Sequence, residues 1–271
     1  MQSLVTYCSH KTLGILLGVI LLFLSCTNPL EEAVPKNYSL LFTGSQYVEV
    51  PYDSTLNSLE TNQFTIEAFV WTDTVTSLEH PAIISIPNSA GGEEIGLYRD
   101  RADSSNRIYL TIDAQPVPDI SGDSIPGLFI EDSTSYFFAV SFDSGQVDVY
   151  INGFRRIGSF LTDSTQIDVG NAPLLIGAGR GSGSAGNYWY GSFDEIRIWR
   201  TVLTPKQIRF HYENPGKLSE NFIRRNSPYD NLIGLWRFNE GAGSAVSDGS
   251  GNDLDGSITG IATWQPIGFS P

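Results

Sequence analysis

Residues 64–71 read Phe64-Thr-Ile-Glu-Ala-Phe-Val-Trp71, and their side chains alternate in character. Successive residues of a β-strand point to opposite faces, so every second residue shares a face. Here one such face is entirely apolar and consists of Phe64, Ile66, Ala68 and Val70. This period-2 pattern predicts a half-buried strand of an antiparallel sheet.

The same alternation recurs along the chain, in residues 107–113, 136–143, 147–151, 174–176 and 193–199. Gly, Asn, Asp, Ser and Pro separate these runs, which is typical of turns between short strands. Asn152-Gly153 directly follows the run 147–151 and is a strong signal for a type I′ hairpin. Together these features predict an all-β fold, an antiparallel β-sandwich.

One short helix is predicted after Thr204-Pro205, where threonine is the N-cap and proline occupies the first helical position. It ends near Glu213, because Asn214-Pro215 follows. We interpret His211 as a packed or half-exposed helix residue rather than a ligand.

The N-terminus predicts export. The apolar run Leu13–Leu24 follows a weakly basic start and precedes Ser25-Cys26, as in a secretory signal peptide. Phe23-Leu24-Ser25-Cys26 resembles a bacterial lipobox, in which the cysteine is lipidated. We therefore expect residues 1–25 to be a lipoprotein signal peptide, Cys26 the lipidation site and residues 26–36 a tether. An uncleaved anchor and ordinary cleavage near Ser25 are the alternatives.

This interpretation predicts an outer membrane lipoprotein that touches the membrane only through its N-terminal lipid. Glu31-Glu32 loosely resembles the acidic export signal of Bacteroidetes surface lipoproteins, so the periplasmic and the cell-surface faces are both open. The chain has 16 basic and 30 acidic residues, a formal net charge of −14. Such a surface repels nucleic acid, so no nucleic-acid partner is expected.

Four stretches resemble the LamG-like jelly roll of the concanavalin A-like lectin/glucanase superfamily. They are Leu41–Pro51, Phe64–Val70, Val147–Gly153, and Gly191–Trp199 followed by Leu203–Ile208, and they occur in the family's order. The resemblance implies a concanavalin A-like jelly roll with one short helix over residues 37–265. Within it, residues 215–231 are expected to be a connector and residues 232–265 to supply the closing strands of the sandwich. Residues 232–265 also resemble the strand pair that opens such domains, so the start of a second domain is the alternative.

The sequence offers little for catalysis, so we expect no enzyme. Glucanases of the superfamily carry a Glu-x-Asp-x-(x)-Glu strand that this chain lacks. Glu93-Glu94 and Asp194-Glu195 are adjacent pairs, whose members point to opposite faces of a strand. His80 and His211 are the only histidines outside the signal segment, which disfavours Ser-His-Asp chemistry.

The resemblance implies a structural Ca²⁺. The candidate oxygen ligands are Asp194, Asp248, Asn252, Asp253 and Asp255, four of them in one glycine-rich loop. Thr43 replaces an aspartate of the family pattern, which removes one ligand. The alternative is an ordinary Asx-rich turn.

Sugar binding requires exposed aromatic faces with planar polar groups. The candidate ligand-binding residues are Trp71, Tyr98, Tyr109, Tyr150, Arg180, Tyr188 and Tyr190. Each aromatic residue also has a structural interpretation, as part of a core, and Trp189 is expected to pack.

We therefore expect non-catalytic recognition of a glycan or glycoprotein at the cell envelope, an inference from the resemblance because fold alone does not fix function. A protein-adhesion or scaffold module is the first alternative. A glycoside hydrolase with unrecognised carboxylates is the second.

Overall fold

The central strand β3 (Gln63–Thr72) carries the alternating stretch and pairs with β8 (Thr134–Asp143) along its whole length. The structure is a computed structural model, and it describes residues 38–74, 80–100, 107–113, 115–117, 130–160, 166–180, 184–218 and 231–266. Cys26 and the predicted signal peptide and tether lie outside these residues, as does most of the predicted connector. No helix within the described ranges is long and apolar enough to cross a membrane.

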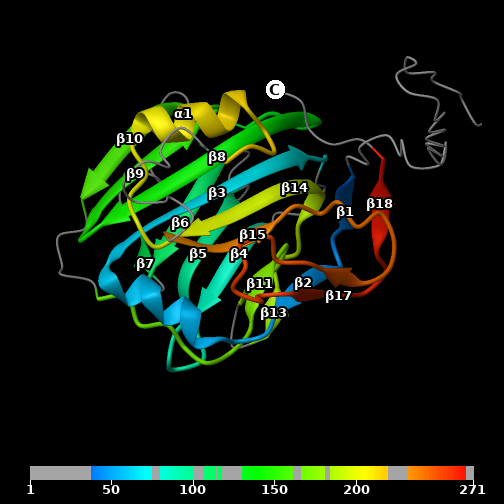
Figure 1. Ribbon diagram of the computed structural model, residues 1–271, viewed down its shortest axis with the longest axis horizontal. Helices are drawn as coiled ribbons and strands as arrows, with labels where there is room; N and C mark the ends of the chain where they lie inside the picture. The colour runs from blue at the N-terminus through cyan, green and yellow to red at the C-terminus, as the bar shows by residue number, and fades with distance from the viewer. Residues whose placement is uncertain are drawn as a thin grey trace, which may run out of the picture. The chain divides into compact units, whose positions relative to one another are not determined.

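Two antiparallel sheets and a two-stranded ribbon contain the strands (Figure 1). The first, sheet A, has the order β10-β9-β8-β3-β14-β1-β18, with β15 also paired to β14. Its other strands are β1 (Ser39–Thr43), β9 (Gln146–Ile151), β10 (Phe154–Phe160), β14 (Tyr190–Trp199), β15 (Leu232–Trp236) and β18 (Thr263–Gln265).

The second, sheet B, has the order β16-β17-β2-β11-β4-β5-β6-β7. Its strands are β2 (Tyr47–Val50), β4 (Ala82–Pro87), β5 (Glu93–Asp100), β6 (Arg107–Ile112), β7 (Gln115–Pro116), β11 (Leu174–Ile176), β16 (Ala245–Val246) and β17 (Gly256–Thr259). The ribbon consists of β12 (Gly179–Arg180) and β13 (Ala185–Gly186).

The main core lies between the two sheets. Phe64, Ile66, Ala68 and Val70 of β3 all belong to it and are fully buried. Sheet B contributes residues such as Ile84, Leu97 and Leu110. The predicted apolar stripes therefore form a sandwich core, and the predicted all-β antiparallel sandwich is confirmed.

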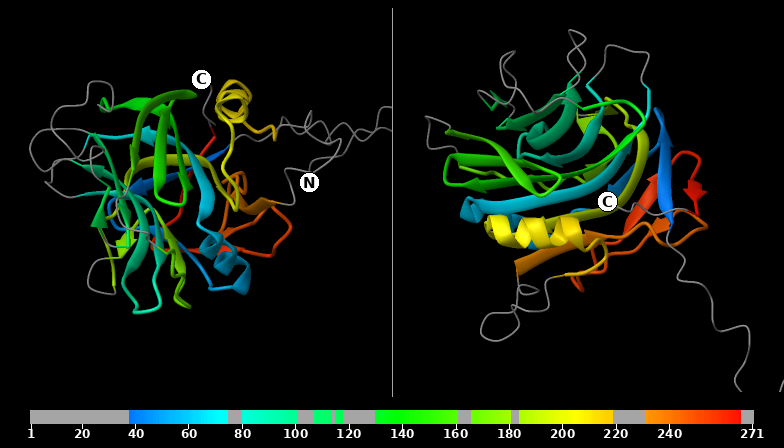
Figure 2. Two further views of the ribbon diagram at one scale, coloured as in Figure 1. Left: turned by 90° about the vertical axis from the view of Figure 1, so that its left-hand side faces the viewer. Right: turned by 90° about the horizontal axis from the view of Figure 1, so that it is seen from above.

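A second core covers the outer face of sheet A. Helix α1 (Pro205–Glu213) packs there, and Ile208 meets Phe69, Tyr150 and Trp199 in one cluster. Figure 2 shows the helix lying along this face. The expectation of a half-buried strand is thus wrong for β3, because the helix buries its other face as well.

The local signals act as predicted. Thr204 caps α1 through a capping box with Gln207, and Asn214 ends the helix. Asn152 and Gly153 have φ values of 51° and 75°, which the type I′ turn between β9 and β10 requires. A short 3₁₀ helix, η1 (Ser54–Thr61), was not predicted.

The tail of the chain pairs with earlier strands. β15 lies beside β14, β17 beside β2, and β18 beside β1. Trp236 and Phe238 are fully buried in the main core. These strands therefore form part of the same two sheets.

Candidate functional site

Three half-exposed tyrosines gather where β1, β2 and β14 meet, and we call Tyr47, Tyr188 and Tyr190 the aromatic edge. Trp189 stands between two of them and is fully buried, with its ring 5.3 Å from that of Phe193. Because neighbours in extended chain point to opposite sides, burying Trp189 turns Tyr188 and Tyr190 outward. The expectation that Trp189 packs is confirmed.

The turn between β1 and β2 supports this edge. The Gln46 side chain accepts a hydrogen bond from the Thr43 amide (2.9 Å) and donates one to the Thr43 hydroxyl (2.9 Å). Gly44 has a φ of 86°, and its N–H donates to the Trp189 carbonyl. A Cβ at Gly44 would overlap the Tyr190 ring, so only glycine lets that ring lie against the turn.

Tyr47 and Tyr188 stack, with ring centroids 6.1 Å apart and planes 30° from parallel. The Tyr188 hydroxyl donates to the carbonyl of Ala185, which pairs with Arg180 in the β12–β13 ribbon. Arg180 donates from one terminal nitrogen to the Pro173 carbonyl, and its Nε has no hydrogen-bond partner among the described residues. The ribbon that contains Arg180 therefore lies beside Tyr188 of the aromatic edge.

The other predicted ligand residues do not join this edge. Trp71 lies half-buried on sheet A beside Ser192 and Ser135. Tyr98 and Tyr150 are 6% and 2% exposed, so neither can offer a ring face to a sugar. Those two assignments are corrected, because Tyr98 bonds to Glu93 and Tyr150 packs beneath α1. The Tyr109 side chain lies outside the described residues.

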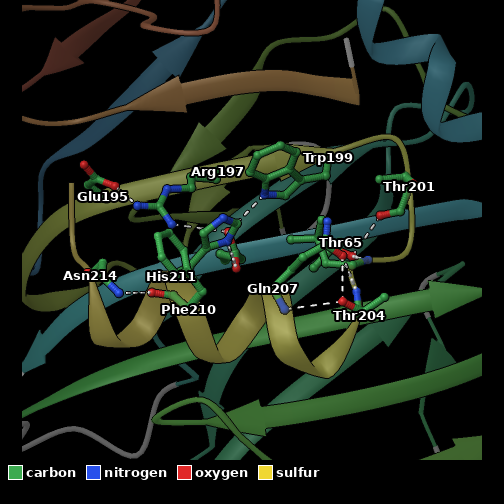
Figure 3. A network of polar contacts seen from close by, with 12 residues as sticks. Thr65, Glu195, Arg197, Trp199, Thr201, Thr204, Gln207, Phe210, His211 and Asn214 are labelled. Atoms are coloured by element: carbon green, nitrogen blue, oxygen red, sulfur yellow. Dashed lines mark hydrogen bonds and ion pairs between the residues drawn. The ribbon is translucent and has the colours of Figure 1, made fainter. Parts of the chain in front are cut away.

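A buried polar network lies beneath α1 (Figure 3). The Glu67 carboxylate contacts His211 Nδ1 at 2.9 Å and accepts from Trp199 Nε1 at 3.0 Å. Burial would raise the pKa of Glu67, but His211, Arg197 and Trp199 together outweigh it and lower that pKa. His211 also stacks parallel to Trp199, with centroids 5.5 Å apart.

Arg197 completes the network between two carboxylates. It contacts Glu67 at 3.4 Å and pairs closely with Glu195, which also accepts from Arg237 at 2.5 Å. A β-bulge between Phe193 and Ile196 places Asp194 and Glu195 outside the regular alternation of β14. Asp194 and Glu195 therefore need not point to opposite faces of the strand, which corrects the expectation for this pair.

This network is built for packing rather than for chemistry on a substrate. Glu67 and Glu195 are 1% and 3% exposed and are neutralised by arginine. His211 Nε2, the atom that would serve a nucleophile, is buried and has no hydrogen-bond partner within the described ranges. The His–Glu pair thus anchors the helix to the sheet.

Two further glutamates lie at the start of β5. Glu93 accepts hydrogen bonds from Ser85 (2.7 Å), Thr111 (2.6 Å) and Tyr98. Glu94 is 1% exposed, and its Oε1 finds no hydrogen-bond partner in the described part of the chain. Burial raises the pKa of Glu94 to about 7, and the nearby carboxylates of Asp113 and Asp168 act in the same direction.

The loop predicted to hold calcium is an Asx-type turn. The Asp248 carboxylate accepts from the amides of Leu235 (2.9 Å), Ser250 (2.8 Å) and Leu254 (3.1 Å), and from the Ser250 hydroxyl (2.6 Å). Asp255 in turn accepts from the Asp248 amide at 2.7 Å. N–H and O–H donors therefore occupy both oxygens of Asp248 and one oxygen of Asp255.

The remaining predicted ligands do not complete a metal site. Asn252 donates from its amide nitrogen to the carbonyls of Leu232 and Ile233, Asp253 is exposed, and Asp194 is buried on β14. No group of three or more His, Cys, Asp or Glu among the described residues is arranged to hold a metal ion. The side chains as arranged do not fit the expected calcium.

Sequence reasoning did not select Tyr47 or Gln46 for the edge. Tyr47-Val-Glu-Val50 does alternate, and that pattern places Tyr47 and Glu49 opposite the buried Val48 and Val50. This alternation indicates that Tyr47 faces outward, but it does not show that Tyr47 contacts Tyr188. That contact depends on the fold, because the two residues are far apart in sequence.

Comparison with known proteins supports the fold. Residues 42–209 match the family model described as the concanavalin A-like lectin/glucanases superfamily. No curated protein matches the sequence.

Several solved structures are similar. A candidate carbohydrate-binding protein from Bacteroides ovatus is 16% identical, with a TM-score of 0.58, over 90% of this chain and 66% of that one. This chain thus spans just under two thirds of that protein. A pentraxin from Limulus polyphemus is 17% identical, with a TM-score of 0.49, over 65% and 82% of the two chains.

Domain 4 of an extracellular arabinanase from Geobacillus stearothermophilus, in complex with arabinotriose, is 20% identical, with a TM-score of 0.41, over 55% and 66%. At these identities the likeness concerns the fold alone. The family model, in contrast, covers more than half of the sequence and coincides with the observed sandwich. The chain therefore belongs to the concanavalin A-like lectin/glucanases superfamily.

Proposed function

We propose that this protein recognises a glycan without catalysis, and that the aromatic edge is its binding surface. The observation that carries the proposal is the grouping of three half-exposed tyrosines, Tyr47, Tyr188 and Tyr190, beside the ribbon that contains Arg180. Aromatic faces pack against the C–H faces of sugar rings, while guanidinium groups donate to their oxygens.

Two further observations support it. The superfamily description includes lectins, and one similar structure carries a carbohydrate-binding assignment of its own. Within the described residues, the buried carboxylates Glu67 and Glu195 are held in ion pairs, which leaves them unavailable as acid or nucleophile.

A glycan array tests the proposal. The purified protein is applied in parallel with Tyr188→Ala and with Tyr52→Ala, a control for an exposed tyrosine elsewhere. We expect binding to a defined set of glycans that Tyr52→Ala keeps and Tyr188→Ala weakens about tenfold, or about 1.4 kcal/mol. Silence from the folded wild-type protein would instead favour a protein partner.

We also propose that the chain is an outer membrane lipoprotein acylated at Cys26, which its signal-like N-terminus supports. Metabolic labelling with an alkyne fatty acid tests this. Label should enter the wild-type protein and be absent from Cys26→Ala. Equal labelling of the wild-type protein and Cys26→Ala would show that any lipid is attached to a residue other than Cys26.

A further inference from the structure

An exposed phenylalanine stands at the tip of the β9–β10 hairpin. Phe154 is 51% exposed, although most large apolar side chains of the described residues are buried. It follows the turn Asn152-Gly153 directly, at the edge strand of sheet A. β1, which supports the aromatic edge, lies near the opposite end of that sheet. This ring therefore belongs to a different surface.

Arg209 of α1 is fixed over this ring. Its guanidinium carbon lies 4.0 Å from the Phe154 ring centroid. A Cβ at Gly153 would lie 3.0 Å from Arg209 Cδ, so the absence of a side chain there lets the arginine stem pass close to the hairpin. Arg209 Nε donates to Glu213 at 2.5 Å. No hydrogen bond within the described ranges uses its two terminal nitrogens, so they remain available to an acceptor.

A second guanidinium lies near the same ring. Arg156 is exposed, its guanidinium carbon lies 5.8 Å from the Phe154 centroid, and it forms no ion pair with the described residues. Lys206 on α1 is likewise exposed and unpaired there. Arg155 is paired with Asp148 at 2.6 Å. In a chain with a net charge of −14, this local excess of cations is unusual.

We propose that Phe154, Arg156 and Arg209 form a binding site for an acidic polysaccharide. A sugar ring would pack on the exposed part of the phenylalanine, and its carboxylate or sulfate would pair with the terminal nitrogens of the arginines. Guanidinium suits this role because it presents a planar fork to an oxyanion while stacking on an aromatic ring. The proposal rests on glycan recognition as the function and names a ligand class at a second surface.

A sugar acid fits this surface better than a membrane does. Binding to anionic lipid relies on a broad cluster of basic residues, typically about four to eight. Here Asp148 and Glu213 each pair with one of the arginines, which limits the excess charge to a small area around one ring. The geometry matches one charged sugar more closely than a lipid surface.

The experiment compares polygalacturonate with its fully methyl-esterified form, and adds heparin as a sulfated probe. The full chain is titrated with each polymer by calorimetry at low salt. We expect binding to polygalacturonate or heparin, at least tenfold weaker binding to the neutral ester, and weakening with added salt. Absence of binding to both acidic polymers overturns the proposal.

Variants locate the site. Arg156→Gln with Arg209→Gln should weaken acid-polymer binding at least tenfold, whereas Arg200→Gln with Lys217→Gln removes the same charge elsewhere and should change it less than threefold. Arg209→Lys keeps the charge but loses the fork, so we expect a several-fold loss. Equal losses in both double variants, or no loss in the first, overturn the proposal. Circular dichroism melts establish that each variant is folded.

Two controls separate this proposal from related ones. Tyr188→Ala should weaken glycan binding at the aromatic edge about tenfold and leave polygalacturonate binding unchanged, so the two surfaces are tested independently. Vesicles of phosphatidylglycerol test the membrane alternative. Binding to vesicles that depends on Arg156 and Arg209, without binding to either acidic polymer, would overturn the polysaccharide assignment.

Discussion

Two groups of buried carboxylates in this protein have opposite surroundings. Beneath α1, Glu67 and Glu195 share Arg197 and receive further bonds from His211 and Arg237. At the start of β5, Glu94 is as deeply buried, and the charged groups that act on it are the carboxylates of Asp113 and Asp168. The pKa of Glu67 is lowered, whereas burial raises that of Glu94 to about 7.

The difference shows that partners, rather than depth, decide whether a buried carboxylate stabilises a fold. A buried charge costs several kcal/mol unless opposite charges and hydrogen bonds compensate. The network beneath α1 has both and fastens the helix to sheet A. The Glu94 carboxylate accepts a hydrogen bond from the Asp168 amide, but its Oε1 has no partner among the described residues. Ionisation of Glu94 therefore lowers the stability of the folded protein.

Removing the central cation should have the largest effect. Arg197→Met leaves Glu67 and Glu195 buried without their shared partner, and we expect a loss of about 3–5 kcal/mol in the free energy of unfolding. Urea denaturation measures it. Arg155→Met removes an exposed ion pair with Asp148 and should cost less than about 1 kcal/mol. Similar losses of stability in Arg197→Met and Arg155→Met would show that the buried network contributes no more than an exposed ion pair.

The Asp248 turn provides a carboxylate compensated by N–H donors instead of cations. Asp248→Ala leaves the amides of Leu235, Ser250 and Leu254 without their acceptor. We expect the free energy of unfolding to fall by about 2–4 kcal/mol. The cost should be the same with calcium and with a chelator. A wild-type melting temperature that rises with calcium, and no longer does so in Asp248→Ala, would argue for a metal at this loop.

Glu94→Gln should stabilise the protein at alkaline pH. The ordinary pKa is 4.5 and the folded value is about 7. The buried carboxyl of Glu94 therefore costs no stability below pH 4.5, where it is neutral in both the folded and the unfolded chain. The protein loses stability as pH rises from there through 7, because the unfolded chain ionises first. We expect a gain of about 1–3 kcal/mol at pH 8 and little change at pH 4. A variant without this pH-dependent gain would mean that Glu94 ionises freely in the folded state.

Glu67 predicts the opposite slope in the wild type. Its pKa is lowered, so the stability from its ionised form is present above pH 4.5 and is lost as pH falls through the folded value. Chemical denaturation between pH 3 and 9 should therefore show stability falling on both sides of a maximum near the ordinary carboxyl pKa. A curve that only rises with pH would contradict the assignment of Glu94, and a curve that only falls would contradict that of Glu67.

The smallest effect is expected at the end of α1. Thr204→Ala removes the capping box with Gln207 and should cost about 1 kcal/mol. Because the buried network still holds the helix, Trp199 should remain in its native environment, which near-ultraviolet circular dichroism reports. Loss of that signal would show that the cap, rather than the network, holds α1 in place.

Most of the fold could be predicted from local patterns. Alternating apolar residues located β3, β8 and β9, and Thr204-Pro205 located α1. β4 and β5 were not among the predicted strands. Ala82–Pro87 is buried on both faces and so does not alternate, while β5 opens with two glutamates and contains Gly96.

The candidate site was predicted only in part. Tyr188, Tyr190 and Arg180 lie close together in sequence and were among the predicted ligand-binding residues. Tyr47 joins them through long-range packing that no local pattern records. Tyr150 appeared available because the sequence cannot show that α1 returns over the outer face of sheet A.

The most direct test of glycan recognition at the aromatic edge is nuclear magnetic resonance of protein carrying ¹³C-labelled tyrosine rings. The wild-type protein is titrated with a glycan that binds on the array. We predict shifts in the ring resonances of Tyr47, Tyr188 and Tyr190, and none in the buried rings of Tyr98 and Tyr150. Saturable binding that leaves the three edge resonances unchanged would contradict the account.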